Sequence, residues 1–138
     1  MLYIVGTPIG NLGDITQRAL EILRATPTIV MESPQDSMKL LRAFKLPQKN
    51  IIKFNERNKK AARGVVEHAL LSGDVVYITS AGMPGISDPG ADIVCLARAC
   101  ETPVTIIPGV SALTSAIALS GMTFHEFTFV GFLPKKAG

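Results

Sequence analysis

The chain has 138 residues, of which 47% are hydrophobic and 18% are charged. This is the size and composition of one globular domain, and it excludes an intrinsically disordered chain. The formal net charge of +3 is too small to identify a nucleic-acid binder, and it does not exclude one. The first residues lack a basic segment followed by a long apolar core, so we expect a cytoplasmic protein without a signal peptide.

Short β-rich runs alternate with amphipathic stretches along the chain. The predicted strands are Leu2–Val5, Thr28–Met31, Ile51–Phe54, Val75–Thr79 and Val104–Ile107. Two predicted helices each have an apolar face, made of Ile15, Ala19, Ile22 and Leu23 in one and of Val65, Val66, Ala69 and Leu70 in the other. Strands that alternate with helices predict an α/β fold, here an αβα sandwich with a five-stranded, mostly parallel sheet.

The ends of the helices carry their own signals. Asp14 is predicted to cap the first helix, and Gly73 to end a later one in the left-handed conformation. Asp88-Pro89 predicts a helix start with a capping carboxylate. Residues 111–120 predict a helix of small residues packed tightly on the sheet, and the run from Phe127 predicts the start of another strand.

Membrane, disulfide and metal sites are not expected. The most apolar region, 104–122, contains Pro108-Gly109 and several hydroxyl residues, so it is interpreted as strand, turn and helix rather than as a membrane span. Cys95 and Cys100 lie on one predicted helix with side chains about 140° apart, so they should not pair with each other. No further cysteine or histidine cluster completes a zinc pattern.

Three loops that follow predicted strands are rich in glycine, proline and hydroxyl residues. They are the first loop, Gly6–Asn11, the second loop, Ser80–Gly90, and the third loop, Pro108–Ala112. In an open parallel sheet, ligands bind outside the carboxyl ends of the strands. Glycine lets the backbone approach a ligand closely, although any strand-to-helix turn also uses glycine and proline. Three such loops on one edge favour a shared ligand.

Two nucleotide-binding motifs are excluded. Gly6, Gly10 and Gly13 are spaced by four and three residues, whereas the dinucleotide motif requires G-x-G-x-x-G. A Walker phosphate loop, which ends in Gly-Lys-Ser/Thr, is also absent from the sequence.

The three loops together resemble a known family. Residues 2–16 with Arg18-Ala19, residues 81–90 and residues 107–112 are similar, in order and spacing, to the signatures of the tetrapyrrole (corrin/porphyrin) methylase superfamily. The likeness is strongest to its branch of ribosomal RNA small subunit 2′-O-ribose methyltransferases. This resemblance implies a class III methyltransferase of two domains, with S-adenosylmethionine bound between the halves. It also implies ribosomal RNA or the small ribosomal subunit as partner, and a homodimer.

The resemblance further implies which residues belong to which part. Residues 1–133 would form the S-adenosylmethionine-binding N-terminal domain, and residues 134–138 would begin the connection to a C-terminal domain that this sequence does not contain. The residues that match the family's cofactor positions are Pro8, Ile9, Ala81, Gly82, Met83, Ile86, Ser111 and Ala112. If the second loop wraps the methionine part of the cofactor, Gly82→Val should abolish cofactor binding with little loss of stability. The alternative is that glycine is needed at position 82 only because the backbone there adopts an unusual angle.

The sequence departs from the family after the second strand. The branch usually has an Ala-Glu-Asp-Thr-Arg run where this chain has Met31-Glu-Ser-Pro-Gln35, so only Glu32 is kept. Methylation of a ribose hydroxyl gains from a general base, and Glu32 is the one acidic candidate, with a solvated loop carboxylate as the alternative. The catalytic residues are therefore unassigned. Methylation of a tetrapyrrole or another small molecule, and a non-catalytic cofactor-binding module, remain open.

Overall fold

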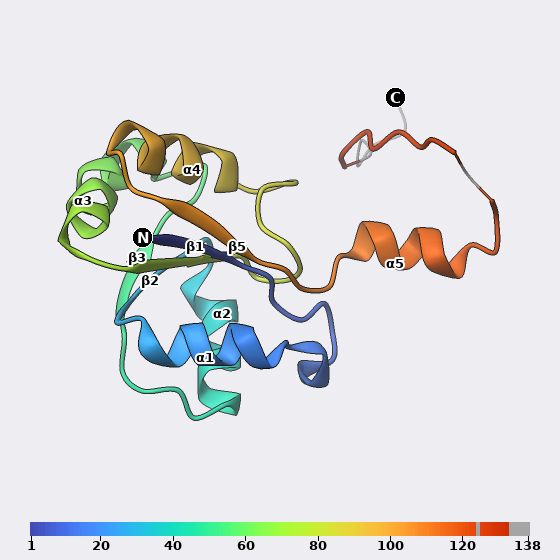
Figure 1. Cartoon of the computed structure of the whole chain (residues 1–138), viewed down its shortest axis with the longest axis horizontal. Coiled ribbons are helices and arrows are strands. Elements are labelled where there is room, and N and C mark those ends of the chain that lie inside the picture. The colour runs from blue at the N-terminus through green and yellow to red at the C-terminus, as the bar shows by residue number, and fades with distance from the viewer. Residues whose placement is uncertain (124, 133–138) are drawn as a thin grey trace.

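The computed structural model describes residues 1–123 and 125–132 as one five-stranded sheet flanked by helices (Figure 1). The strands are β1 (Leu2–Val5), β2 (Thr28–Met31), β3 (Asn50–Lys53), β4 (Val75–Ile78) and β5 (Val104–Ile107). All neighbouring strands pair in parallel, in the order β3-β2-β4-β1-β5. The predicted α/β class and five-stranded sheet are confirmed. The bounds of β3 and β4 differ by one residue from the sequence prediction.

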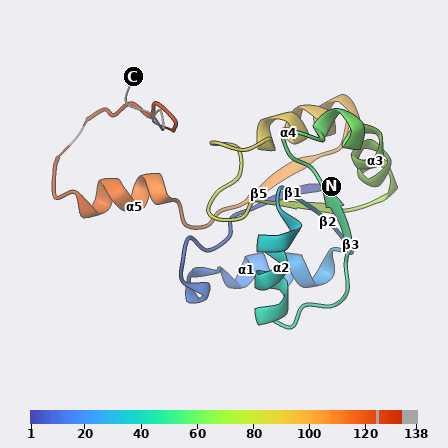
Figure 2. The ribbon, with the colours of Figure 1, turned by 180° about the vertical axis from the view of Figure 1, so that it is seen from behind.

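Two pairs of helices cover the two faces of the sheet (Figures 1 and 2). On one face lie α1 (Gln17–Ala25) and α2 (Pro34–Ala43), preceded by a short 3-10 turn, η1 (Leu12–Asp14). On the other lie α3 (Lys59–Ser72) and α4 (Gly90–Ala99). The remaining helix, α5 (Ala112–Leu119), follows the edge strand β5 and projects away from both layers.

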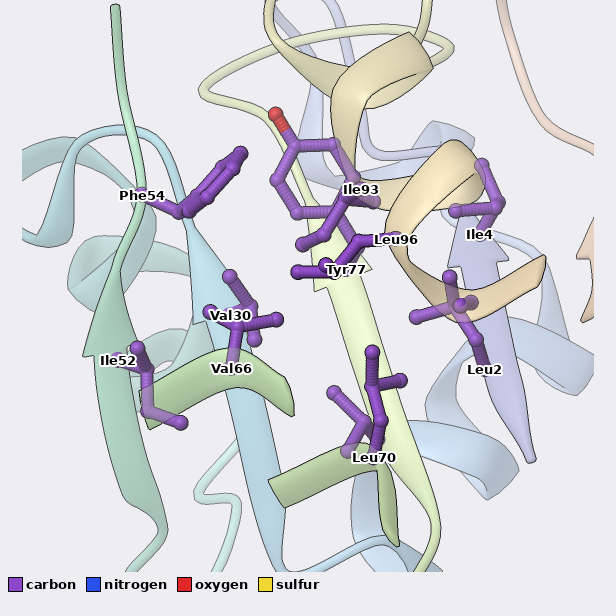
Figure 3. Packing of buried hydrophobic residues seen from close by; sticks show 12 residues of the cluster. Leu2, Ile4, Val30, Ile52, Phe54, Val66, Leu70, Tyr77, Ile93 and Leu96 are labelled. Carbon is purple, nitrogen blue, oxygen red and sulfur yellow. The ribbon is translucent and has the colours of Figure 1, made fainter. Parts of the chain in front are cut away.

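Each face of the sheet has its own apolar core. The core under α3 and α4, drawn in Figure 3, contains Leu2, Ile4, Val30, Ile52, Phe54, Val66, Leu70, Val75, Tyr77, Ile93, Leu96 and Ala97. The core under α1 and α2 contains Val5, Ala19, Leu23, Ile29, Met31, Leu40, Leu41, Val76, Ile78 and Ile107. The side chains of β4 are buried on both faces, which explains why this strand is a continuous apolar run.

The predicted apolar faces of the helices are mostly confirmed. Ala19 and Leu23 are buried, and Ile15 and Ile22 pack against the same core. In α3, Val66 and Leu70 are buried and Ala69 packs against them. Val65 is 57% exposed, so its placement on the buried face was wrong. It precedes Val66 by one residue, which on a helix turns its side chain by about 100° away from the core.

One predicted helix cap is wrong, and at a second helix end the predicted backbone conformation is wrong. Thr16, rather than Asp14, caps α1, because its Oγ1 accepts a hydrogen bond of 3.1 Å from the Ala19 amide. Asp14 lies in the preceding 3-10 turn. Gly73 ends α3, as predicted, and donates its amide to the Ala69 carbonyl at 3.2 Å, but its backbone is extended, with a φ of 165°, rather than left-handed.

The predicted packing of residues 111–120 on the sheet is also wrong. None of the side chains of α5 is buried, and Leu119 is 87% exposed. Ile106, on the neighbouring edge strand, is 55% exposed. The small apolar residues were correct for a helix, but the described part of the chain offers this helix no surface to cover.

The chain beyond α5 does not form the predicted strand in the residues that the structure describes. From 125 to 132 the backbone is irregular, and the rest of the predicted strand, from 133, lies outside the described residues. Phe129 and Val130 are 48% and 73% exposed, and among the described residues this segment pairs with no strand. Across the described ranges, no helix has the length and apolarity needed to cross a membrane.

Candidate functional site

The three glycine-rich loops meet at one edge of the sheet because their strands are neighbours. In the strand order β4-β1-β5, the second, first and third loops all leave from carboxyl ends. The first and second loops are joined by two backbone hydrogen bonds of 3.0 Å, one in each direction between Thr7 and Gly82. Thr7 is 3% exposed, and its hydroxyl lies 3.4 Å from the Thr79 carbonyl oxygen. These hydrogen bonds therefore tie the first and second loops to the end of the sheet.

Met83 connects the second loop to the third. Its sulfur accepts a hydrogen bond of 3.2 Å from the Gly109 amide. A Cβ added at Gly6 would lie 2.6 Å from that sulfur and 2.8 Å from the Gly109 nitrogen, which is too close for any side chain. Gly6 and Gly109 thus allow the first and third loops to pass backbone against backbone. Such an arrangement brings peptide groups together where a ligand can approach them.

Glycine is needed at position 82 because of the backbone angle there. Its φ is +78°, in the left-handed region that L side chains rarely adopt. A Cβ there would lie 3.3 Å from Ile9 Cγ2 and 3.7 Å from the Val110 carbonyl oxygen, which is a tolerable crowding. Valine at this position would be strained by the angle itself. The prediction that Gly82→Val leaves stability nearly unchanged is therefore replaced by its alternative, an expected loss of about 1 kcal/mol or more.

The predicted cofactor positions are partly brought together. Pro8 is buried, whereas Ile9 is 37% exposed beside Gly82. Ser111 and Ala112 stand where the third loop enters α5, directly after Val110, and neither is buried. Ala81 is exposed, and its carbonyl accepts a hydrogen bond of 3.2 Å from the Thr79 hydroxyl. Ile86, which is 46% exposed, lies farther along the second loop.

A small hollow lies between the first loop and α2. It has a volume of about 160 Å³ and is lined by Thr7, Pro8, Gly10, Leu12, Asp36, Ser37, Lys39, Leu40, Thr79 and Ser80. Ser37 is 2% exposed, and its hydroxyl has no hydrogen-bond partner in the described part of the chain. Sites for ligands of drug size occupy roughly 300–1,000 Å³. This hollow alone is too small for a nucleoside-sized ligand.

The carboxylates of Glu32, Glu56 and Asp88 form a group beside the second loop that was not recognised in the sequence. Tyr77 is fully buried and donates its hydroxyl to Asp88 Oδ1 at 3.2 Å (Figure 3 shows its oxygen pointing toward the carboxyl end of β4). Burial, followed by the charge and hydrogen bond of Asp88, raises the pKa of Tyr77, so the hydroxyl keeps its proton. Burial, the charge of Asp88 and the charge of Glu56 raise the pKa of Glu32.

The signal for this cluster was present in the strand pattern. Val30 and Tyr77 are paired neighbours in β2 and β4, and both point into the core under α3 and α4. Since side chains alternate along a strand, Glu32 continues the face of Val30 beyond the end of β2. Asp88 was predicted to cap a helix, and it does accept a hydrogen bond of 2.8 Å from the Gly90 amide, with α4 beginning at Gly90.

Two of the four basic residues from 57 to 63, Lys59 and Arg63, are paired with acids. Lys59 Nζ lies 2.9 Å from Glu56 and 2.8 Å from Asp92, and Arg63 Nε lies 2.9 Å from Glu67. They border a hollow of about 320 Å³ between α3 and α4. Cys95, which lines this hollow, and Cys100 are both free thiols, as predicted. The ion pairs offset part of the positive charge of this surface.

Comparison with curated proteins finds relatives over nearly the whole chain. The ribosomal RNA small subunit methyltransferase I of Thermotoga maritima is 48% identical over 137 residues, which cover 97% of this chain and 60% of the relative. The protein of the same name from Vibrio cholerae is 39% identical and covers 99% of this chain and 48% of the relative. The chain thus spans about half to three fifths of the length of these relatives.

Solved structures confirm the fold. The native uroporphyrin III C-methyltransferase of Thermus thermophilus matches 83% of this chain and 51% of its own, with a TM-score of 0.65 and 19% identity. The structure of that enzyme complexed with S-adenosylhomocysteine matches with a TM-score of 0.66 and 20% identity. The family model described as tetrapyrrole (corrin/porphyrin) methylases matches residues 1–136. The chain therefore belongs to the tetrapyrrole methylase family.

Proposed function

We propose that this chain is the cofactor-binding half of an S-adenosylmethionine-dependent methyltransferase that methylates a ribose 2′-hydroxyl in small-subunit ribosomal RNA. The observation that carries the proposal is the joining of three glycine-rich loops at the carboxyl edge of the sheet. The relatives named ribosomal RNA small subunit methyltransferase I support the substrate class.

The loops suit this cofactor because they offer backbone rather than charged side chains. Gly6 has no room for a Cβ and Gly109 has little, so the first and third loops pass backbone against backbone at the edge, where an amino-acid carboxylate, a ribose or an adenine can approach them. When bound, the cofactor supplies an activated methyl group on a sulfonium. The residues Pro8, Ile9, Ala81, Gly82, Met83, Ile86, Ser111 and Ala112 would hold and align it, and their work is positioning and exclusion of water.

Glu32 is the proposed acceptor of the ribose hydroxyl proton. A ribose hydroxyl is a poor nucleophile at neutral pH, and a base works best when its pKa is near the working pH. Burial and the neighbouring carboxylates raise the pKa of Glu32, which moves it in that direction. The side chain follows β2, next to β4 and its loop, at the same edge as the three loops.

The proposed division of the protein places residues 1–133 in this domain and residues 134–138 in the connection to a second domain. Two observations support a second half: the chain covers 60% and 48% of two relatives, and the hollow beside the first loop holds only about 160 Å³. We propose that the second half closes the cofactor site, so this chain alone should bind S-adenosylmethionine weakly. We also propose a cytoplasmic homodimer, which sedimentation of the full-length protein would contradict by showing a monomer.

The loop after β2 favours a second candidate. Only Glu32 is kept from the run that is usual for the ribosomal RNA branch, and Pro34 now begins α2. Losing the usual acidic and arginine side chains there would alter contacts with a large anionic substrate. Methylation of a tetrapyrrole or another small molecule is therefore the second candidate function. A cofactor-binding module without catalysis is the third.

The substrate is tested by transfer of a labelled methyl group. Full-length protein is incubated with labelled S-adenosylmethionine and either unmodified small ribosomal subunits or uroporphyrinogen III. We expect label in the ribosomal RNA, at a nucleoside that mass spectrometry identifies as 2′-O-methylated. Label in the tetrapyrrole alone would replace the first candidate by the second, and label in neither would contradict the first candidate.

A further inference from the structure

One carboxylate holds the second loop together. Asp88 Oδ1 accepts hydrogen bonds from the amides of Gly85, at 3.0 Å, and Gly90, at 2.8 Å. Asp88 Oδ2 accepts from the Gly85 amide at 2.8 Å. Tyr77, on the strand below, donates its hydroxyl to Oδ1 at 3.2 Å. The side chain therefore links the middle of the loop, the start of α4 and the end of β4.

Beyond Met83, the second loop has few other contacts that fix its shape. Its backbone turns twice through the left-handed region, with a φ of +78° at Gly82 and of +95° at Gly85. Among the amides from 83 to 88, only that of Gly85 donates a hydrogen bond in the described part of the chain. Hydrogen bonds to a charged acceptor are about twice as strong as neutral ones. Asp88 is thus the main restraint on the segment between Met83 and α4.

The surroundings of this carboxylate are closely packed. A Cβ added at Gly90 would lie 2.7 Å from Asp88 Oδ1, 2.7 Å from the Gly85 nitrogen and 2.9 Å from Gly85 Cα. Gly90 therefore leaves the space in which the carboxylate reaches Gly85. Tyr77 keeps its proton and remains a donor, because burial and the adjacent Asp88 raise its pKa.

We propose that Asp88 is a positioning residue, which fixes the second loop in the shape that binds S-adenosylmethionine without touching the cofactor itself. This inference rests on the proposed function. Asp88 acts through Gly85, whose amide it binds, and so orders the backbone around that residue, including the adjacent Ile86, before the ligand arrives. A loop ordered in advance loses less conformational entropy on binding, so its affinity is higher.

The test compares three variants of the full-length protein. Asp88→Ala removes both acceptor oxygens, and Asp88→Asn keeps one. The matched control is Asp92→Ala, which removes a carboxylate four residues later that pairs with Lys59, away from the loop. Two quantities are measured below the unfolding temperature of every variant: the Kd for S-adenosylhomocysteine by calorimetry, and the hydrogen exchange rates of the Gly85 and Gly90 amides by NMR.

We expect Asp88→Ala to raise the Kd by about tenfold or more, Asp88→Asn by less, and Asp92→Ala by less than about twofold. Exchange at Gly85 and Gly90 should become at least about tenfold faster in Asp88→Ala, while amides within β4 keep their rates. Unchanged exchange and an unchanged Kd in folded Asp88→Ala would overturn the inference. So would a Kd that rises only in proportion to the unfolded fraction, because that result describes a helix cap and nothing more.

The two proposals fail in different ways. A wild-type protein that binds neither S-adenosylmethionine nor S-adenosylhomocysteine contradicts the proposed function. The exchange rates still decide whether Asp88 fixes the loop. Gly90→Ala provides a second route to the same restraint, since its methyl group would displace the carboxylate from Gly85. It should raise exchange at Gly85 in the same way as Asp88→Ala, and a rate equal to that of the wild type would count against the proposal.

Discussion

The sheet with its four covering helices and the segment from the third loop onward are built from similarly apolar sequence, yet they pack in opposite ways. Up to Ile107, the apolar faces of helices and strands meet in two cores. Beyond it, α5 has no buried side chain, and Phe129 and Phe132 are 48% and 88% exposed. The difference shows that an apolar sequence specifies local structure, while burial depends on a partner surface.

The three glycine-rich loops lie where these two regions meet. The first and second loops belong to the packed body and are tied together through Thr7 and Gly82. The third loop leaves that body and is held to it by the contact of Gly109 with Met83. The candidate cofactor site is thus a junction between a rigid part and a part whose packing is incomplete.

The largest expected effect compares the same substitution in the two regions. Leu23→Ala removes a fully buried side chain from the core under α1 and α2, and should cost about 2–5 kcal/mol of unfolding free energy. Leu119→Ala, at a side chain that is 87% exposed, should cost less than about 0.5 kcal/mol in this 138-residue chain. Urea denaturation measures both. A loss above about 1 kcal/mol at Leu119 would mean that α5 packs against a surface, and would break the comparison.

A methyl group at the junction should weaken the cofactor site. Gly6→Ala would place a carbon 2.8 Å from the Gly109 nitrogen, so the first and third loops must separate. We expect the affinity of the full-length protein for S-adenosylhomocysteine to fall by about tenfold or more, as measured by calorimetry. The control is Gly64→Ala in α3, where no atom lies within 4 Å of the added carbon. It should stabilise the fold by about 0.5–1 kcal/mol and leave affinity unchanged.

Met83→Thr should have a smaller effect at the same junction. Threonine is too short to place an acceptor where the Met83 sulfur meets the Gly109 amide, so the third loop loses one contact with the body. Sulfur is a weak acceptor, and we expect the Kd for S-adenosylhomocysteine to change by less than about threefold. A tenfold change would give Met83 a direct part in binding that the present contacts do not include.

The smallest expected effect is the pH dependence at Glu32. Its pKa is raised in the folded protein above the ordinary 4.5, so its ionised form costs stability once the pH exceeds the folded pKa. Glu32→Gln should therefore be slightly more stable than the wild type at pH 7, by less than about 0.5 kcal/mol because the group is partly exposed. The difference should disappear as the pH falls through the folded pKa. Thermal unfolding from acid to neutral pH measures it, and a variant that is less stable at neutral pH would show a lost interaction instead.

The order of strands and helices was predictable because hydrophobic periodicity reports which faces are buried. The runs at β1, β2 and β5 had the correct bounds, and Ala19 and Leu23 were correctly placed on a buried face. The position of α5 was not predictable, since its small apolar residues specify a helix without naming the surface that covers it. The cap of α1 was wrong because Asp14 and Thr16 are both good capping residues, and only the backbone path distinguishes them.

The sequence was enough to predict which loops form the candidate site. It was not enough to predict the contacts between those loops. The sequence placed three loops at one sheet edge, and the structure joins them. Contacts across loops, such as that between Met83 and Gly109, depend on how far each turn extends and have no local signature. The same holds for Tyr77 and Asp88, which are eleven residues apart and meet because the second loop folds back over β4.

The central claim is that S-adenosylmethionine binds against these three loops. The most direct measurement is a crystal structure of the full-length protein with S-adenosylhomocysteine. We predict electron density for the ligand beside Pro8, Gly82 and Ser111, with backbone groups of the first and second loops within hydrogen-bonding distance. Ligand density elsewhere, for example in the hollow of about 320 Å³ between α3 and α4, would contradict the account.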